Sequence, residues 1–208
     1  MAQARRSLLP LTGAAFAILF VLSFIVSGEV PGADESGEKV IALISENESK
    51  LMLGAILGSV AAILFLFFIG SIRSTLRSAE GDAGTLSAVA FAGGIVAATG
   101  MLIFSGIAFT LAEGISDFEP GAAQVLNALN ANFFFPLAGG IATFQLATGL
   151  AAIRTGALPS WLAWISLLIG VLMVTPLGFF AFLAGVVWVL VASIVLWGGE
   201  PTRAPAGR

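Results

Sequence analysis

The sequence contains no cysteine, no histidine and no tyrosine. Without cysteine the chain can form no disulfide, and it has no thiolate to act as a nucleophile or a metal ligand. Without histidine it lacks the base of a Ser–His hydrolase, the ligands of a bis-histidine haem and the usual ligands of a zinc protease. These exclusions rest on residue identity. We therefore predict a protein that is not an enzyme, with no cofactor, no metal site and no catalytic residue.

Charged residues are also scarce, at 10% of the 208 residues, whereas 58% are hydrophobic. A soluble domain carries about 25% charged residues, so this chain lacks the polar groups needed to cover a water-exposed surface. The mean hydropathy of +1.04 fits a protein whose solvent is a lipid bilayer. The chain has no basic cluster of useful size, and we predict no nucleic-acid partner.

Long uncharged runs separate the few charged residues, and each is long enough to cross a hydrocarbon core of about 30 Å. The last run, between Arg154 and Glu200, is about twice the length of one crossing, and the turn-forming sequence Thr175–Gly178 divides it. The fold class predicted is all-α membrane, a six-helix transmembrane bundle in which residues 1–208 form one domain. Whether residues 155–199 make two full crossings or a shallower hairpin stays open. The predicted spans are about 7–27, 51–73, 84–112, 126–154, 160–175 and 179–197.

Positive charges are distributed unevenly over the two sides that six crossings define. Of the nine Lys and Arg residues, only Lys39 and Lys50 fall on the side away from the N-terminus. The positive-inside rule therefore places both termini in the cytoplasm, and five crossings would weaken this bias. The first span has features of a signal peptide, but its length favours a retained helix over a cleaved leader. The cytoplasmic positive charges are Arg5, Arg6, Arg73, Arg77, Arg154, Arg203 and Arg208.

Residues 28–50 form the longest segment outside the predicted spans, and they are rich in Asp and Glu. Ser36 is a suitable N-cap for a short amphipathic helix that continues into span 51–73. We predict that this acidic segment lies on the extracytoplasmic side. Its carboxylates do not have the spacing of a calcium-binding loop, which favours a solvated acidic surface over a cation site.

Small residues recur within the predicted spans, where they allow helices to approach closely in lipid. Such faces favour contacts between helices of one chain, a homo-oligomer or another membrane-protein partner. Membrane lipids are the remaining predicted partners. The small residues are Gly54, Gly58, Gly93, Gly94, Ala97, Ala98, Gly139, Gly140, Ala181 and Gly185.

No predicted span has an ionisable side chain in its interior, which argues against a proton-coupled pump. The strongest polar group consists instead of amides. Pro136 and Gly139-Gly140 loosen the helix beside these amides, so we predict that they line a polar pocket. The alternative is that each amide caps a helix or bonds to a neighbouring helix. The amides are Asn127, Asn130, Asn132 and Gln145.

Two stretches carry loose apolar motifs. One runs from Asn132-Phe133-Phe134 to Trp161-Leu162-Ala163-Trp164, and the other covers residues 67–77. In these motifs the chain resembles a group of small bacterial multi-pass membrane proteins of unknown function, common in high-GC genomes. The resemblance implies the same multi-span fold in a bacterial cytoplasmic membrane. It implies no activity, cofactor or site residue.

We therefore expect a non-enzymatic membrane protein that acts as an accessory or scaffold subunit or binds lipid between its helices. The alternative is a small permease or channel for a neutral or amphiphilic solute, which would use the amides between Asn127 and Gln145. That alternative requires a continuous or half-open polar cavity that reaches Asn130 or Gln145. An enzyme is the third and weakest hypothesis.

Overall fold

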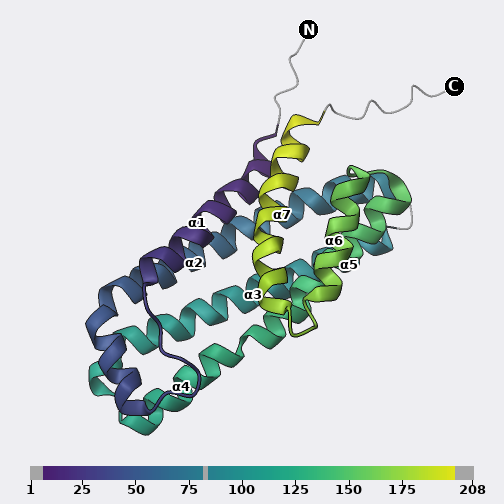
Figure 1. Cartoon of the computed structure of the whole chain (residues 1–208). Helices are drawn as coiled ribbons and strands as arrows, with labels where there is room; N and C mark the ends of the chain where they lie inside the picture. The colour runs from purple at the N-terminus through teal and green to yellow at the C-terminus, as the bar shows by residue number, and fades with distance from the viewer. Residues whose placement is uncertain (1–6, 82–83, 200–208) are drawn as a thin grey trace, which may run out of the picture.

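In the computed structural model, which describes residues 7–81 and 84–199, the chain is a bundle of helices (Figure 1). No strand occurs in these ranges. Most helices begin or end at a cap, a glycine or a proline that the sequence supplies. In order, they are η1 Leu9–Leu11, α1 Thr12–Ser27, α2 Gly37–Glu80, α3 Thr85–Glu113, η2 Ile115–Asp117, α4 Pro120–Asn132, α5 Phe134–Thr155, α6 Ser160–Leu172 and α7 Gly178–Gly198.

Five segments in the described ranges are long and apolar enough to cross a membrane, which confirms an all-helical bundle of membrane type. The remaining predicted span, 160–175, corresponds to α6, which is apolar but only 13 residues long. It is shorter because a turn begins at Met173: the Thr175 N–H donates to Leu172 O at 3.0 Å. The five segments are Leu9–Ser27, Gly37–Glu80, Thr85–Glu113, Pro120–Thr155 and Gly178–Gly198.

Helix α2 is a single element of 44 residues that joins the predicted surface helix to the predicted span 51–73. Ser36 caps it, as predicted, by accepting the Lys39 N–H at 3.4 Å. The sequence between Ser36 and Gly81 contains no proline, so nothing interrupts the backbone hydrogen bonds. At 1.5 Å per residue the helix extends about 66 Å, roughly twice the thickness of a hydrocarbon core. It also passes Arg73 and ends at Glu80, whose carboxylate accepts N–H groups at the start of α3.

The predicted span 126–154 is divided between α4 and α5, which meet at Phe133. Helix α4 begins at Pro120, where Glu119 followed by a proline predicts a helix start, and therefore six residues before the predicted span. The division lies just before Pro136, which has no N–H to donate to the preceding turn. The Phe133 N–H donates instead to Asn130 O at 3.2 Å in a tighter turn. The helix that the sequence predicts to be loosened near Pro136 is therefore divided into two helices at Phe133.

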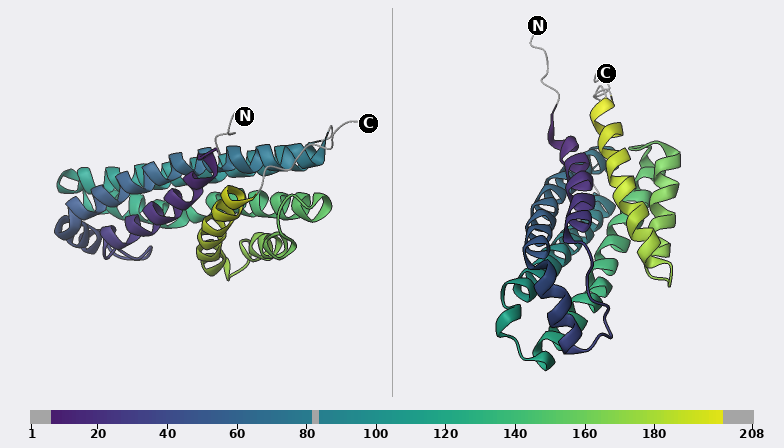
Figure 2. Two further views of the ribbon diagram at one scale, coloured as in Figure 1. Left: turned by 90° about the horizontal axis from the view of Figure 1, so that it is seen from above. Right: turned by 60° about the vertical axis from the view of Figure 1, so that its left-hand side comes forward.

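The helices run between two opposite ends of the molecule (Figure 1). We call the end formed by Gly37, η2 and α4 the α4 end, and the end where α1 and α6 begin and α7 stops the terminal end. Helix α1 runs antiparallel to α2, with Gly13 beside Phe68 and Ser27 beside Gly54. The part of α2 before Gly54 therefore extends about 25 Å beyond the last turn of α1. Figure 2 shows α6 and α7 together on one side of α2 and α3.

Two separate clusters of buried apolar side chains hold the bundle together. The larger cluster lies among all the long helices and contains Phe16, Phe65 and Trp188. The smaller cluster lies at the α4 end, where Val40 and Ile115 are buried between α2, α3 and α4. This second cluster packs α4 and the end of α3 against the part of α2 that extends past α1.

The predicted small residues lie mostly between helices of this same chain. A Cβ atom on Gly140 would approach the Ala97 backbone nitrogen to 2.5 Å, and one on Gly93 would approach the Phe144 nitrogen to 2.6 Å. Such distances require α3 and α5 to pack with almost no side chain between them. Gly54 and Gly58 likewise face α1 and α3. These faces are therefore occupied within the chain, and a homo-oligomer or protein partner stays a prediction.

Candidate functional site

A cavity of about 470 Å³ lies near the α4 end, at the level where α1 stops. Its walls come from α1, α2, α3, α4, the start of α5 and the start of α7, together with the connector that follows Gly28. The volume lies within the range of about 300–1,000 Å³ that is common for sites that bind small molecules. We call it the large cavity.

Most of the wall of the large cavity is apolar, and phenylalanine rings form much of it. The Phe20 and Phe182 rings meet edge-on with centroids 5.3 Å apart, and Phe134 meets Phe182 at 5.9 Å. Two other rings mark the rim, since Phe24 is 51% exposed and Phe179 is 57% exposed. Among the described residues that line the cavity, none carries a charge. The cavity therefore favours an apolar guest.

The polar side chains in the wall are three serines and two amides. Ser23 and Ser27 donate to carbonyl oxygens of their own helix, at 2.6 and 2.8 Å, so their protons are already used. The two amides both lie on α4, and Asn127 donates to a distant part of the chain. Asn130 Oδ1 is buried and has no hydrogen-bond partner. A buried acceptor without a partner costs about 1–3 kcal/mol. Because this oxygen is buried, it does not face the open space of the cavity.

The connector between α1 and α2, residues 28–36, crosses the large cavity and contributes Val30 and Pro31 to its wall. Asn127 holds this connector in place, because its Nδ2 donates to Gly32 O at 2.8 Å. Asn127 is 5% exposed, so this hydrogen bond is shielded from solvent. One predicted amide therefore fixes the connector at the wall of the cavity.

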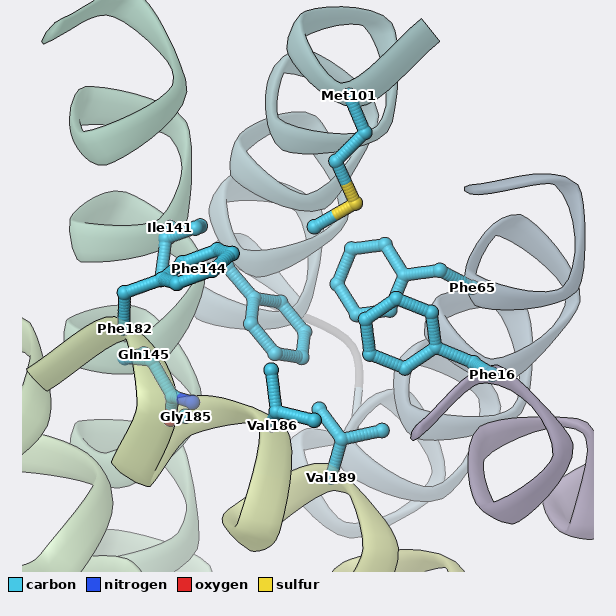
Figure 3. Close-up of a pocket in the computed structure, with 10 residues that line it drawn as sticks. All are labelled: Phe16, Phe65, Met101, Ile141, Phe144, Gln145, Phe182, Gly185, Val186 and Val189. Atoms are coloured by element: carbon cyan, nitrogen blue, oxygen red, sulfur yellow. The ribbon is translucent and has the colours of Figure 1, made fainter. Parts of the chain in front are cut away.

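A group of packed rings and aliphatic side chains separates the large cavity from the terminal end (Figure 3). Phe65 lies between Phe16 and Phe144, with ring centroids 4.9 and 5.7 Å away. Met101 and Phe182 line both the large cavity and a much smaller void behind these rings. The void measures about 20 Å³, close to the space of one water molecule. We call this layer the aromatic floor.

Gln145 lies on the far side of the aromatic floor, beside Gly185 (Figure 3). It is 1% exposed, and its Oε1 accepts the Ser166 hydroxyl at 2.5 Å. This pair joins α5 to α6. The Trp188 Nε1 donates to Leu162 O at 2.9 Å and joins α6 to α7 in the same way. Gln145 therefore bonds to a neighbouring helix and does not line the large cavity.

The structure brings two of the four predicted amides together. Asn127 and Asn130 both line the large cavity. Asn132 is exposed and its Nδ2 donates to Ala128 O at 2.8 Å within α4. Gln145 is separated from them by the aromatic floor. Reasoning from the sequence did not find the other contributors to the cavity, namely the end of α1, the connector and the phenylalanines of α7. No local pattern marks them, because each is an ordinary apolar or connecting residue until six helices pack together.

Within the described ranges, no group of three or more acidic side chains lies close enough to hold a metal ion. Comparisons of the chain with protein-family models, with curated proteins and with solved structures find no match in any of the three.

Proposed function

We propose that this chain is a non-enzymatic protein of the bacterial cytoplasmic membrane that binds a membrane amphiphile in the large cavity. The observation that carries the proposal is the cavity itself, which is about 470 Å³, apolar along most of its wall and polar at one side through Asn127 and Asn130. An amphiphile has the same division into an apolar and a polar part. The exposed rim at Phe24 and Phe179 gives it a route from the surrounding lipid.

The level of the large cavity supports the same proposal. Helix α1, with the η1 turn, is 19 residues long, or about 28 Å, which matches one bilayer core. The cavity lies where α1 ends, and the α4 end extends beyond that level. The cavity therefore straddles the boundary between lipid and water, where amphiphiles reside.

The proposed orientation has six crossings and both termini in the cytoplasm. Arg73 lies in the last third of α2 and Arg154 in the last turn of α5, both toward the terminal end, whereas Lys39 and Lys50 lie in the first third of α2, toward the α4 end. This distribution supports a cytoplasmic terminal end. Trp161 and Trp197 are exposed at the start of α6 and the end of α7, where interfacial anchors are expected. The predicted cytoplasmic Arg5, Arg6, Arg203 and Arg208 lie outside the described residues.

The orientation is tested by single cysteines, because the natural chain has none. Asp34→Cys, Ser78→Cys and Pro176→Cys each replace an exposed residue. In intact cells, a membrane-impermeant maleimide is expected to label Asp34→Cys and, more slowly, Pro176→Cys. Ser78→Cys is expected to react only after the membrane is opened. Labelling of Pro176→Cys from the cytoplasmic side alone would mean that α6 does not cross and that six crossings are wrong.

Filling the large cavity tests the proposed binding. Ala108 lies in its wall on α3, so Ala108→Phe places a ring in the space. We expect the variant to fold and to lose about tenfold or more of its affinity for co-purifying lipid, measured by native mass spectrometry. Ala92→Phe is the matched control, because Ala92 is an exposed alanine of the same helix outside the cavity. Wild-type lipid occupancy in Ala108→Phe would contradict the proposal.

A small permease is the second candidate, and a half-open cavity that reaches Asn130 favours it. The aromatic floor separates this cavity from the terminal end, so transport requires Phe182 and Met101 to move apart. A binding protein requires no such movement. Transfer of a bound amphiphile between the two faces of a vesicle therefore distinguishes the candidates.

A further inference from the structure

We propose that the connector, residues 28–36, is a movable cover that opens the large cavity to the water on the α4 side of the membrane. The hydrogen bond from Asn127 to Gly32 keeps this cover closed, and we call it the latch. The inference rests on the proposed function, because it names the route by which the same cavity exchanges its guest with water. The exposed rim at Phe24 and Phe179 is a separate route that leads to lipid.

Both ends of the connector are fixed by tight packing between helices. At its start, Ser27 in the last turn of α1 lies against Gly54 of α2. At its end, Gly37 lies against the Pro120 carbonyl at the start of α4. A Cβ atom on either glycine would overlap these groups, so neither end moves without separating two helices. Movement of the connector is therefore confined to its middle.

Little holds the middle of the connector in place. None of the side chains of residues 28–36 is buried, and Val30, which lines the cavity, is 59% exposed. Among the described residues, the latch, at 2.8 Å, is the one hydrogen bond that joins the connector to a distant part of the chain. Other bonds, such as that between Glu35 and Lys39, join residues close in sequence. A loop with so few buried contacts opens locally at a low cost in free energy, as lids do.

The connector is long enough to move without unwinding either helix. Its two ends lie about 25 Å apart along α2, because Ser27 is level with Gly54 and Gly37 begins the helix. The ten Cα-to-Cα steps from Ser27 to Gly37 reach about 35 Å when the chain is extended. The middle can therefore move about 10 Å from the line between the ends. Such a displacement uncovers the part of the wall that Val30 and Pro31 form.

The charges on the connector place its outer side in water. Glu29 and Asp34 are exposed, and an ionised carboxylate is costly to transfer into lipid. Figure 1 shows the connector running from the end of α1 toward α4, along the side of the bundle. The aromatic floor closes the cavity toward the terminal end. Opening of the connector therefore joins the cavity to water on the α4 side alone.

The test measures how quickly a charged reagent reaches a buried position in the cavity wall. Ser105 lines the cavity on α3 and is 6% exposed, and the natural chain has no cysteine. The full-length Ser105→Cys protein in lipid nanodiscs is treated with a trimethylammonium methanethiosulfonate, whose permanent charge excludes it from lipid. We expect slow labelling, at a rate set by opening of the connector.

A pair of variants in this Ser105→Cys parent tests the latch. Asn127→Leu removes the latch at nearly constant side-chain volume, and we expect labelling to be about fivefold faster, the value of one hydrogen bond. Asn132→Leu is the matched control, because Asn132 is an exposed amide of the same helix that bonds only within α4. It is expected to label at the parent rate. Equal rates for Asn127→Leu and the parent would overturn the inference.

A second variant acts on the connector itself and does not depend on the folding of Asn127→Leu. Pro31→Gly gives the open connector more conformational freedom at a position that is not buried. We expect labelling of Ser105→Cys to be about two- to fivefold faster. An unchanged rate in Pro31→Gly would count against a connector that moves.

Opening of the connector must also be separated from unfolding of the bundle. Gly140→Ala serves here, because it disturbs the close contact of α3 with α5 and leaves the connector untouched. We expect it to label at the parent rate. An acceleration equal to that of Asn127→Leu would mean that the reagent enters through unfolded protein, which contradicts the inference.

The labelling experiment needs no amphiphile, so it fails independently of the proposed function. If labelling depends on the latch and neither wild type nor Ala108→Phe carries lipid, the movable cover stands and the proposed function fails. If Ala108→Phe loses a lipid that wild type carries and labelling ignores the latch, only this inference fails.

Discussion

Gly140→Leu is expected to abolish the folded bundle, whereas Gly139→Leu is expected to leave it intact. A Cβ atom on Gly140 would lie 2.5 Å from the Ala97 backbone nitrogen and 3.0 Å from its Cα, so the obstacle is backbone that cannot rotate away. Nothing lies within 4 Å of a Cβ atom on Gly139. The two glycines are neighbours in sequence with equal helix propensity, and only one faces α3.

The effect of Gly140 is measured by the yield of monodisperse protein after extraction and by thermal unfolding in detergent. Gly140→Ala tests the same contact with a smaller side chain. It is expected to lower the free energy of unfolding by about 1–3 kcal/mol, as is usual for overpacking. Gly139→Ala is expected to be neutral or to stabilise α5 slightly, because alanine favours a helix. Equal stability of the two alanine variants would mean that α3 and α5 are not in this close contact.

Trp188→Ala is expected to be the most damaging truncation of a single side chain, with a loss of about 3–5 kcal/mol. Trp188 is 2% exposed, its ring meets the Phe144 edge at 6.0 Å, and its Nε1 donates to Leu162 O. The substitution leaves a cavity among α5, α6 and α7 and removes the side-chain hydrogen bond to the Leu162 carbonyl. Helix α6 is short and has few other hydrogen bonds to neighbouring helices. We therefore expect its packing against the bundle to weaken more than that of the other helices.

The control for Trp188 is Trp164→Ala, which deletes the same group from α6 at a position that is 62% exposed. Its unfolding temperature in detergent is expected to change little, since the ring contacts solvent or lipid more than protein. The unfolding temperature of Trp188→Phe is expected to lie between those of Trp188→Ala and Trp164→Ala. Phenylalanine keeps most of the apolar contact but loses the hydrogen bond. Similar losses for Trp188→Ala and Trp164→Ala would show that α6 and α7 do not pack through Trp188.

The sequence predicted the helices well where one residue decides the outcome. Ser36 caps α2, Pro120 opens α4 and the Thr175–Gly178 turn separates α6 from α7. It also predicted that the helix capped by Ser36 continues into the span 51–73, but not that α2 passes Arg73 and ends at Glu80. Charges mark where a helix leaves lipid and not where its backbone stops. It did not predict that α4 and α5 are separate helices, because a proline such as Pro136 can bend a helix as well as divide it.

The site was less predictable, because it depends on contacts between distant parts of the chain. Asn127 and Gln145 have similar chemistry and belong to the same predicted span. One bonds to Gly32, 95 residues away, and the other to Ser166 across a different helix pair. Only the packing of α1, α4 and α7 decides which amide faces a cavity, and the aromatic floor that separates them leaves no periodic signal.

The long α2 helix joins the two ends of the molecule through one unbroken backbone. About 25 Å of this helix lies on the α4 side of Gly54 and about 39 Å on the other. Val40 in its first turn is buried in the cluster at the α4 end, and the Glu80 carboxylate at its last turn accepts N–H groups of α3. Between these points α2 packs against α1 at Phe68 and against α3 at Ile69. Helix α2 therefore sets the distance between the two ends of the bundle.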